Sequence, residues 1–209
     1  MSTSSHTIAV PDLQIGNVGS VVNMVRKCGA AGEVISTPAQ LNDHSKIILA
    51  GVGSFDAAME GVRDRGWHEP LTRLVVHEKV RVLGICLGMQ IMCRSSEEGK
   101  LPGLGWIDAD VQRFRFPSGS SLKVPHMGWN TVEVTKANPL IDAGDGEQRF
   151  YFVHSYHVVC RNPEDVVATA RYGYDVTAAF CRDNVYGVQF HPEKSHRFGM
   201  ALIQRFLDL

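Results

Sequence analysis

Hydrophobic residues in the first part of the chain gather in short continuous runs, and stretches in which apolar positions recur every three or four residues separate these runs. A short apolar run predicts a buried strand, whereas the longer spacing predicts a helix with one buried face. Strands that alternate with helices are typical of a parallel sheet covered by helices on both faces. We therefore expect strands at 7–10, 34–36, 46–50 and 80–85, and helices at 19–31, 55–65 and 70–78.

The pattern changes after about Gly105, where strand-like runs and turn residues follow one another without intervening helices. Two of these runs flank Arg182-Asp183-Asn184, a polar segment typical of a hairpin turn. The sequence contains no internal repeat, low-complexity tract or linker, and predicts one mixed α/β domain over residues 1–209 with a flavodoxin-like half and an antiparallel, strand-rich C-terminal part. We expect strands at 132–134, 150–153, 176–181 and 185–190, and a closing amphipathic helix at 199–209.

Composition and charge are those of an ordinary soluble globular protein, with 44% hydrophobic and 21% charged residues. The net charge of −1 gives no reason to expect binding to nucleic acid or to anionic membranes. No apolar run approaches the ~20 residues that span a bilayer, and the polar start has no signal-peptide core. We expect a cytoplasmic protein.

The five cysteines argue against a disulfide framework or a zinc site, because their number is odd and no C-x-x-C pair occurs. This usage fits a reducing cytoplasm. Four of them, Cys28, Cys93, Cys160 and Cys181, are expected to be small core residues.

The fifth, Cys86, lies between two glycines in the segment Gly-Ile-Cys-Leu-Gly at 84–88, after an apolar run and before helix-compatible residues. A nucleophile on a tight turn between a strand and a helix forms a nucleophile elbow. The residues two positions away must be small, since larger side chains would collide with the strand and the helix. The N-terminus of the following helix favours the thiolate form. A small buried cysteine in a glycine-flanked turn is the alternative.

A thiolate nucleophile needs a base and an orienting group, and residues 186–195 supply both. The run through Phe190 alternates like a strand and ends at His191. In an extended chain Glu193 projects to the same side as His191, which suits a carboxylate that holds the imidazole in one tautomer. Alone, the pair is equally well a surface strand end. Together with the elbow, it predicts a triad of Cys86, His191 and Glu193.

The elbow and the C-terminal Phe-His-Pro-Glu-Lys-Ser at 190–195 together resemble the class I, triad-type glutamine amidotransferases. Further stretches at 51–59, 124–130 and 151–156 resemble the glutaminase subunits of imidazole glycerol phosphate synthases, and the resemblance runs from about Asp12 to the C-terminus. It implies the class I glutamine amidotransferase fold, and hydrolysis of L-glutamine to glutamate and ammonia without a cofactor or metal.

The oxyanion formed by attack on an amide needs preorganised N–H donors. One donor is expected to be the backbone N–H of Leu87, directly after the nucleophile. Gly51-Val52-Gly53 follows a strand and has a flexible backbone, and the resemblance points to the N–H of Gly53 as the second donor. The family usually has proline where this chain has Ala50, which makes the loop looser. A dinucleotide-binding G-x-G-x-x-G does not fit, because Asp56 occupies the position of its third glycine, while a plain strand-to-helix turn remains the alternative.

Glutamine recognition falls, by the resemblance, to Gln90, Ser155 and Tyr156. Gln90 lies one turn from Cys86 on the expected helix, so it can face the pocket. An ordinary residue of the helix surface is the alternative.

The spacing His154-x-x-His157 suggests a pair of metal ligands. On an extended strand, however, these two side chains point to opposite faces. We therefore expect structural roles for both histidines.

Residues 124–130, Val-Pro-His-Met-Gly-Trp-Asn, carry no triad chemistry and are turn-like and rich in residues favoured at interfaces. The resemblance places Met127 and Trp129 of this segment, with Asn17 and Lys194, at the contact with a synthase subunit that receives the ammonia. A core tryptophan beside a Pro-Gly loop is the alternative. No stretch is left for a synthase domain, and the resemblance implies a separate (βα)8-barrel cyclase, hence a heterodimer.

Two departures from the family pattern leave the ammonia acceptor open. The family commonly has Asp-Tyr-Gly-x-Gly-Asn near the N-terminus, whereas this chain has Asp-Leu-Gln-Ile-Gly-Asn at 12–17. Residues 195–200 resemble those of a paralogous branch that accompanies an amidotransferase acting on a nucleotide-linked sugar for surface polysaccharide. Both branches keep the glutaminase chemistry.

Two other classes of protein compete with a glutaminase. An elbow-cysteine hydrolase or chaperone would share the sheet and Cys86, but would not need His191, Glu193 or a glutamine pocket. A catalytically silent binding module would lack one of the three triad residues, yet all three are present.

Overall fold

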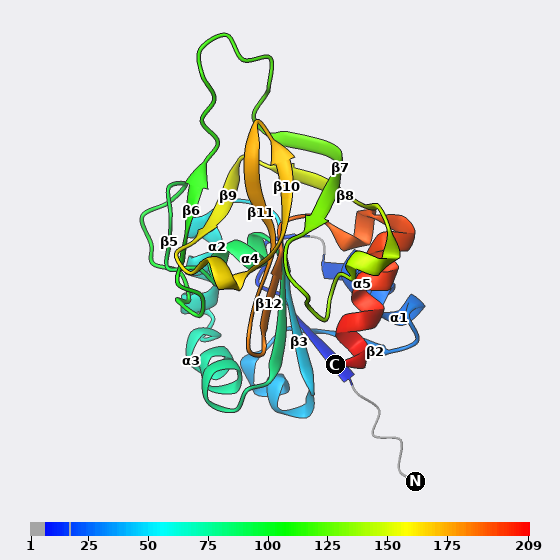
Figure 1. The fold of residues 1–209 in the computed structure, drawn as a ribbon. Coiled ribbons are helices and arrows are strands. Elements are labelled where there is room, and N and C mark those ends of the chain that lie inside the picture. Colours follow the sequence, from blue (N-terminus) through cyan, green and yellow to red (C-terminus); the bar gives the residue numbers. More distant parts are fainter. Residues whose placement is uncertain (1–6, 17) are drawn as a thin grey trace.

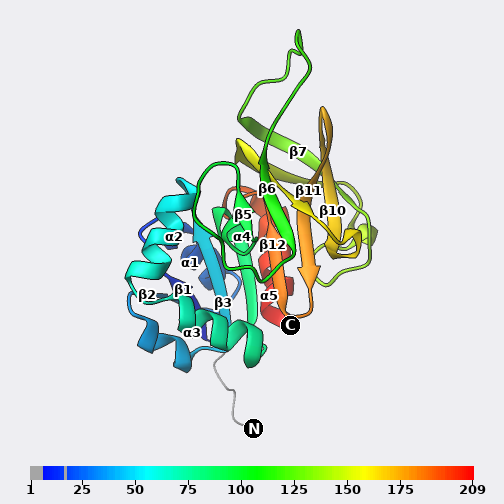
Figure 2. The ribbon, with the colours of Figure 1, turned by 90° about the vertical axis from the view of Figure 1, so that its left-hand side faces the viewer.

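A nine-stranded sheet forms the centre of the molecule, and helices lie against its two faces (Figures 1 and 2). The computed structural model describes residues 7–16 and 18–209. In spatial order, the sheet consists of β2 (Ala31–Ile35), β1 (Thr7–Pro11), β3 (Lys46–Gly51), β4 (Arg81–Cys86), β12 (Val185–Val188), β11 (Tyr174–Arg182), β10 (Val166–Tyr172), β7 (His126–Val134) and β8 (Gln148–His154).

The sheet has a parallel half and an antiparallel half. From β2 to β12 each strand pairs in parallel with the next, and from β12 to β8 the pairing is antiparallel. Helices cover both faces of the parallel half, which explains why its strands appear in the sequence as continuous apolar runs. The predicted α/β architecture with an antiparallel C-terminal part is confirmed.

The helices divide between the two faces of the sheet. One face carries α1 (Val18–Lys27) and α5 (His196–Asp208), and the other carries α2 (Phe55–Asp64), α3 (His68–Thr72), its π-helical continuation η2 (Arg73–His77), and α4 (Leu87–Ile91). Because alternate residues of a strand point to opposite faces, Ile8 and Val10 of β1 pack with α1, whereas Ala9 packs with α2. Short 3₁₀ helices connect other elements: η1 (Pro38–Asp43), η3 (Ala143–Asp145), η4 (Pro163–Asp165) and η5 (Pro192–Lys194).

A second, three-stranded sheet consists of β5 (Ser95–Ser96), β6 (Ala109–Arg113) and β9 (Tyr156–Cys160). The chain passes from the large sheet into the small one at Ser155, between β8 and β9. Among the described residues, no helix is long and apolar enough to cross a membrane.

Several element boundaries differ from the sequence predictions. The first helix ends at Lys27, because Gly29 adopts a positive φ of 83° and β2 already begins at Ala31. The strand before the catalytic histidine candidate ends at Val188, and the closing helix begins at His196. The predicted hairpin is present, since β11 and β12 are antiparallel and joined by a tight turn.

The expectation that residues 124–130 are turn-like is wrong for most of the segment. β7 begins at His126, and it pairs with β8 from His126 opposite His154 to Val132 opposite Gln148. Proline and glycine in this segment suggest a turn locally, but the backbone pairing with β8 outweighs that preference.

Candidate active site

The segment around Cys86 forms a nucleophile elbow, as its sequence predicts. Strand β4 ends at Cys86 and α4 begins at Leu87, with Cys86 at φ 52° and ψ −108°. A positive φ is strained for a non-glycine residue and occurs where the surrounding structure imposes it. A Cβ atom on Gly84 would lie 2.7 Å from the backbone oxygen of Gly88, and one on Gly88 would overlap the backbone oxygen of Leu49. Both glycines are therefore required by close backbone packing around the nucleophile.

His191 and Glu193 form a buried pair. The Nδ1 atom of His191 lies 2.7 Å from Oε1 of Glu193, and their side chains are 1% and 6% exposed. The backbone N–H of His191 donates to the carbonyl oxygen of Tyr151 on β8 at 2.9 Å, which ties this segment to the antiparallel half of the sheet. The carboxylate accepts the Nδ1 hydrogen, and this leaves Nε2 as the nitrogen available for proton transfer.

Two neighbours control the charge of His191. Burial disfavours the imidazolium, but the hydrogen bond with Glu193 and the nearby sulfur of Cys86 outweigh it and raise the pKa of His191 to about 9. Nε2 of His191 is buried and has no hydrogen-bond partner among the described residues. Catalytic hydrogen bonds are often long in an unliganded site and shorten when substrate binds.

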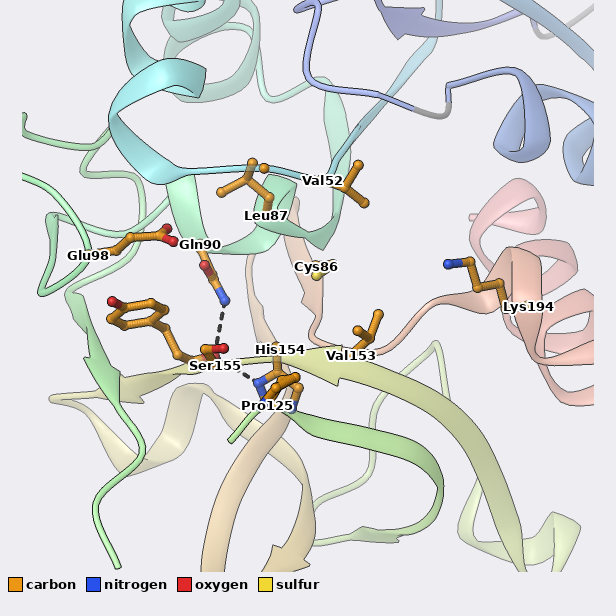
Figure 3. A pocket seen from close by; sticks show the side chains of 12 residues that line it. Val52, Cys86, Leu87, Gln90, Glu98, Pro125, Val153, His154, Ser155 and Lys194 are labelled. Atoms are coloured by element: carbon orange, nitrogen blue, oxygen red, sulfur yellow. Dashed lines mark hydrogen bonds between the residues drawn. The ribbon is translucent and has the colours of Figure 1, made fainter. Parts of the chain in front are cut away.

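A cavity of about 430 Å³ opens above Cys86 (Figure 3). A cavity of this size is in the range that small ligands occupy. The cavity brings together the candidate nucleophile Cys86, both oxyanion candidates and all three predicted glutamine-binding residues, although they are distant in sequence. It is lined by Val52, Gly53, Cys86, Leu87, Gln90, Glu98, Pro125, Val153, His154, Ser155, Tyr156 and Lys194.

Gln90 is nearly buried, so it is not an ordinary residue of a helix surface. Its Nε2 atom donates to the backbone oxygen of Tyr156 at 3.1 Å and to Oε1 of Gln189 at 3.1 Å. Gln189 in turn donates from Nε2 to Sγ of Cys86 at 3.6 Å. Gln189 is not among the residues predicted from the sequence, although it stands two residues before His191 and thus on the same side of an extended chain.

Glu98, which the sequence also did not predict, lies in the pocket wall on the side opposite Lys194, with Cys86 between them (Figure 3). One oxygen of Glu98, Oε2, accepts a hydrogen bond from the backbone N–H of Phe55 at 2.9 Å, at the start of α2. This bond fixes the carboxylate in place. A carboxylate two residues after the edge strand β5 has no sequence signature that would mark it as part of the pocket.

The second oxyanion candidate lies in a closely packed loop. The backbone N–H of Val52 donates to the carbonyl oxygen of Ile15 at 2.5 Å. Gly53 follows with φ 123°, a conformation that favours glycine. A Cβ atom on Gly16 would lie 2.5 Å from the side chain of Val52, so the loop around Ile15 packs directly on this segment.

A pair of histidines lies in the wall of the cavity. Nδ1 of His126 is 2.9 Å from Nε2 of His154, and Nδ1 of His154 is 2.8 Å from the backbone oxygen of Tyr156. Burial lowers the pKa of His126 to about 4 and that of His154 to about 3. Both rings are therefore neutral at physiological pH.

His154 and His157 do not point to opposite faces of one strand, which corrects the sequence prediction. The chain changes sheets at Ser155, and both rings pack against Phe114, with centroid distances of 5.2 and 4.9 Å. Nε2 of His157 lies 3.1 Å from the hydroxyl of Tyr174. Within residues 7–16 and 18–209, no group of three or more His, Cys, Asp or Glu side chains is arranged to hold a metal ion.

The predicted partner-contact residues lie beside the cavity, apart from Asn17, which falls outside the described residues. Met127 and Trp129 are 61% and 41% exposed on β7, and the Trp129 ring stacks on His196 at 5.6 Å. Trp129 is therefore not a core residue. The Nζ atom of Lys194 lies 5.7 Å from the ring centre of Tyr151, and Lys194 also lines the cavity.

The other four cysteines differ from Cys86 in their surroundings. All five cysteines are free thiols, and Cys93 is buried in the core, whereas Cys28, Cys160 and Cys181 are only half-buried. Burial raises the pKa of Cys160 to about 12 and that of Cys181 to about 11, and it also raises the pKa of Cys28 and Cys93. These four thiols are therefore poor nucleophiles at neutral pH.

Known proteins are similar in sequence to this chain over nearly its full length. The family model for glutamine amidotransferase class-I matches residues 9–209. The chain is 46% identical over 200 residues to the imidazole glycerol phosphate synthase subunit HisH 2 of Methanococcus maripaludis, covering 96% of this chain and 98% of that protein. It is 43% identical over 203 residues to the subunit HisH of Leptospira borgpetersenii, covering 97% and 100%.

Solved structures share the fold. A crystal structure of a glutamine amidotransferase superposes with a TM-score of 0.74 at 20% identity, over 96% of this chain and 97% of the other. PurLQS from Thermotoga maritima gives a TM-score of 0.72 at 17% identity, over 98% of both chains. With the family match over residues 9–209 and these close relatives in sequence, the chain belongs to the class I glutamine amidotransferase family.

Proposed function

We propose that this chain is the glutaminase subunit of an imidazole glycerol phosphate synthase. It hydrolyses L-glutamine to glutamate and ammonia with Cys86, His191 and Glu193, and it passes the ammonia to a (βα)8-barrel cyclase subunit in a heterodimer in the cytoplasm. The observation that carries the proposal is the cavity that brings the elbow cysteine together with Gly53, Leu87 and Gln90, beside the buried histidine–carboxylate pair. The family and the relatives named HisH support the same activity.

The charges around the cavity suggest how glutamine is oriented. Glu98 suits the α-ammonium group of the substrate, since its carboxylate is held at one side of the pocket. Gln90, Ser155 and Tyr156 line the same part of the cavity and complete the recognition of the amino-acid end. The side-chain amide then reaches Cys86. Lys194 lies on the side of Cys86 opposite Glu98 (Figure 3), and we expect ammonia to leave toward it.

The proposed reaction has two halves with balanced proton transfers. The Cys86 thiolate attacks the amide carbon, and the N–H groups of Gly53 and Leu87 stabilise the oxyanion. As the C–N bond breaks, imidazolium His191 donates its Nε2 proton to the leaving nitrogen, which gives ammonia and a γ-glutamyl thioester. Neutral His191 then takes a proton from water, the hydroxide attacks the thioester, and glutamate leaves as the thiolate and imidazolium are restored. A pKa of about 9 keeps His191 protonated at neutral pH for the first half.

A partner subunit has direct access to this machinery. The exposed side chains of Met127 and Trp129 lie on β7, and Lys194 reaches from η5 to the edge of the cavity. The loop around Ile15 packs on Val52, next to the oxyanion candidate Gly53. We expect the Val52–Gly53 peptide to have an inactive and an active orientation, and the acceptor subunit to bind the active one better.

The test is the rate of glutamine hydrolysis by the isolated chain, and by the chain with purified cyclase subunit and an analogue of its substrate. Because one oxyanion donor is worth about 10²–10³ in rate, we expect slow hydrolysis alone and stimulation of at least that size by the loaded cyclase. Hydrolysis at full speed by the isolated chain would exclude the switch. No hydrolysis under either condition would exclude the glutaminase.

A second acceptor is supported by one structural observation. His196 belongs to the segment that departs from the family pattern, and its ring stacks on Trp129 in the proposed contact surface. This divergent residue thus contacts the surface that we propose for the partner, which supports a paralogous partner that aminates a nucleotide-linked sugar. Stimulation by such an amidotransferase, and not by the histidine-pathway cyclase, would select this alternative.

A further inference from the structure

Gln189 is a fully buried polar side chain in contact with the sulfur of Cys86, and it has no role in the reaction proposed above. Its exposed fraction is 0%, and its Nε2 atom lies 3.6 Å from Sγ of Cys86. Its backbone N–H donates to the carbonyl oxygen of Ala178 on β11 at 2.9 Å, which fixes the chain at this point. Buried side-chain amides are normally held by specific hydrogen bonds, so the contact with sulfur calls for an explanation.

The orientation of the Gln189 amide follows from its neighbours. The backbone oxygen of Tyr156 can only accept hydrogen bonds, so the atom of Gln90 that faces it, 3.1 Å away, must be the nitrogen. The same nitrogen lies 3.1 Å from the Gln189 amide, and the atom of Gln189 that faces it must therefore be the oxygen. Nε2 of Gln189 is thus turned toward Sγ, and an exchange of its oxygen and nitrogen would place two donors opposite each other.

An N–H donor directed at a buried sulfur favours the charged form of that sulfur. A thiolate accepts hydrogen bonds more strongly than a thiol, because bonds to an ionised group are the stronger ones. The donor also limits the positions that the sulfur can adopt, since moving away would leave the N–H of Gln189 buried without a partner. The other titratable groups around the cavity are Glu98, His154, Tyr156 and Lys194, with the pair of His191 and Glu193 beside it, and a substitution at Gln189 leaves all six side chains in the chain.

We propose that Gln189 is a positioning residue that donates a hydrogen bond from Nε2 to Sγ of Cys86, stabilises the thiolate and holds it toward the cavity. Gln90, which binds Gln189 at Oε1 and lines the substrate pocket, keeps the amide in this orientation. The benefit for catalysis rests on the proposed function, whereas the effect on the sulfur does not.

The test measures the rate at which iodoacetamide alkylates Cys86 as a function of pH, followed by mass spectrometry of the Cys86 peptide. Gln189→Glu changes one donor atom into an acceptor and keeps the shape of the side chain. Gln189→Met keeps the length but removes the donor. Because a hydrogen bond to a charged group contributes on the scale of one pKa unit, the alkylation midpoint should rise by about one pH unit in Gln189→Met and by more in Gln189→Glu.

The matched control is Gln148→Met, which makes the same change at a buried glutamine at the far end of β8 from His154. Its midpoint should equal that of the unaltered chain. A midpoint that stays within about 0.3 pH units of the unaltered chain in both Gln189 variants would overturn the proposal, as would an equal shift in the control. Alkylation requires no glutamine, so a failed glutaminase assay with shifted midpoints would reject the proposed function and leave this inference intact.

Discussion

His191 and His154 are both buried near Cys86, and yet their pKa values move in opposite directions. His191 lies between the sulfur of Cys86 and the carboxylate of Glu193, and these two groups overcome burial and raise its pKa to about 9. His154 faces the ring of His126 and the backbone oxygen of Tyr156, and burial lowers its pKa to about 3. Burial favours the neutral imidazole in both places, so only anionic partners make a buried histidine a proton donor at neutral pH.

The two histidines belong to two sides of the cavity that differ in their chemistry. The segment from Cys86 to α4 and the pair of His191 and Glu193 hold the groups that we propose to exchange protons. The wall from β7 and β8 holds neutral histidines that shape the cavity and do not titrate near pH 7.

The largest effect is expected from Cys86→Ser, which removes the nucleophile and one of the two partners that raise the pKa of His191. Glutamine hydrolysis should fall by at least about 10⁴-fold, as in other enzymes that lose their nucleophile. Synthesis driven by added ammonium salt in the complete complex should survive, because the partner does not need Cys86. Hydrolysis within tenfold of the unaltered enzyme would exclude Cys86 as the nucleophile.

Removing the base should cost more than removing the orienting group. His191→Ala should lower kcat by about 10⁴-fold, at the upper end for a general acid–base. Glu193→Gln should cost about 10²-fold, since the amide oxygen still accepts from Nδ1 but supplies no charge. Steady-state kinetics of both variants decides, and a greater loss in Glu193→Gln would mean that the two roles are assigned wrongly.

NMR titration of the labelled imidazoles measures the pKa values of His191 and His154 separately. Glu193→Gln should lower the pKa of His191 well below about 9, because the charge and part of the hydrogen bonding that raise it are lost. The pKa of His154 should remain low, because burial is its main cause. Equal changes at both histidines would show that a common change in structure, and not the carboxylate, controls them.

The neutral histidines His126 and His154 predict that the folded protein loses stability in acid. Both folded-state pKa values, about 4 for His126 and about 3 for His154, lie below the ordinary value of 6.5. The unfolded chain therefore binds more protons than the folded chain between pH 6.5 and 4, and the free energy of unfolding should fall as the pH is lowered. Each of the two histidines contributes roughly 1.4 kcal/mol per pH unit to this fall. Urea denaturation at several pH values measures this slope, and His126→Gln should reduce it. A variant with an unchanged slope would contradict the assignment.

The smallest effect on activity is expected from Trp129→Ala, at an exposed position of β7. The variant removes the ring that stacks on His196 and should weaken partner stimulation, while alkylation of Cys86 stays unchanged. Val34→Ala, at an exposed site on the opposite edge of the sheet, should leave both properties unaltered. Slower alkylation in Trp129→Ala would indicate that Trp129 acts on the catalytic groups themselves.

The geometry of the elbow and of the His191–Glu193 pair could be predicted from the sequence, because it follows from local rules. Small residues on both sides of Cys86 and the i, i+2 spacing of His191 and Glu193 have geometric consequences that need no knowledge of the rest of the chain. The opposite wall depends on contacts between distant segments. The residues of β7 are turn-like in the sequence, and only the pairing with β8 shows that they form a strand. The carboxylate of Glu98 is held in the pocket wall by the backbone N–H of Phe55 at the start of α2.

Gln189 lies between these two cases. Its spacing from His191 marks the correct side of the chain, and that signal was present in the sequence. Its function, however, depends on Gln90 and Cys86, about a hundred residues earlier in the chain. Only the fold shows that these side chains meet.

The most direct test of the account is covalent labelling by a chloroketone derived from glutamine, followed by peptide mass spectrometry. Such a reagent binds as glutamine does and alkylates the nucleophile that faces the amide position. The account predicts a single adduct on the Cys86 peptide, protection by added glutamine, and no adduct in Cys86→Ser. The raised pKa values of the other four thiols make background labelling slow at neutral pH. Labelling at another residue, or labelling of Cys86 that glutamine does not slow, would contradict a glutamine-binding cysteine nucleophile at the elbow.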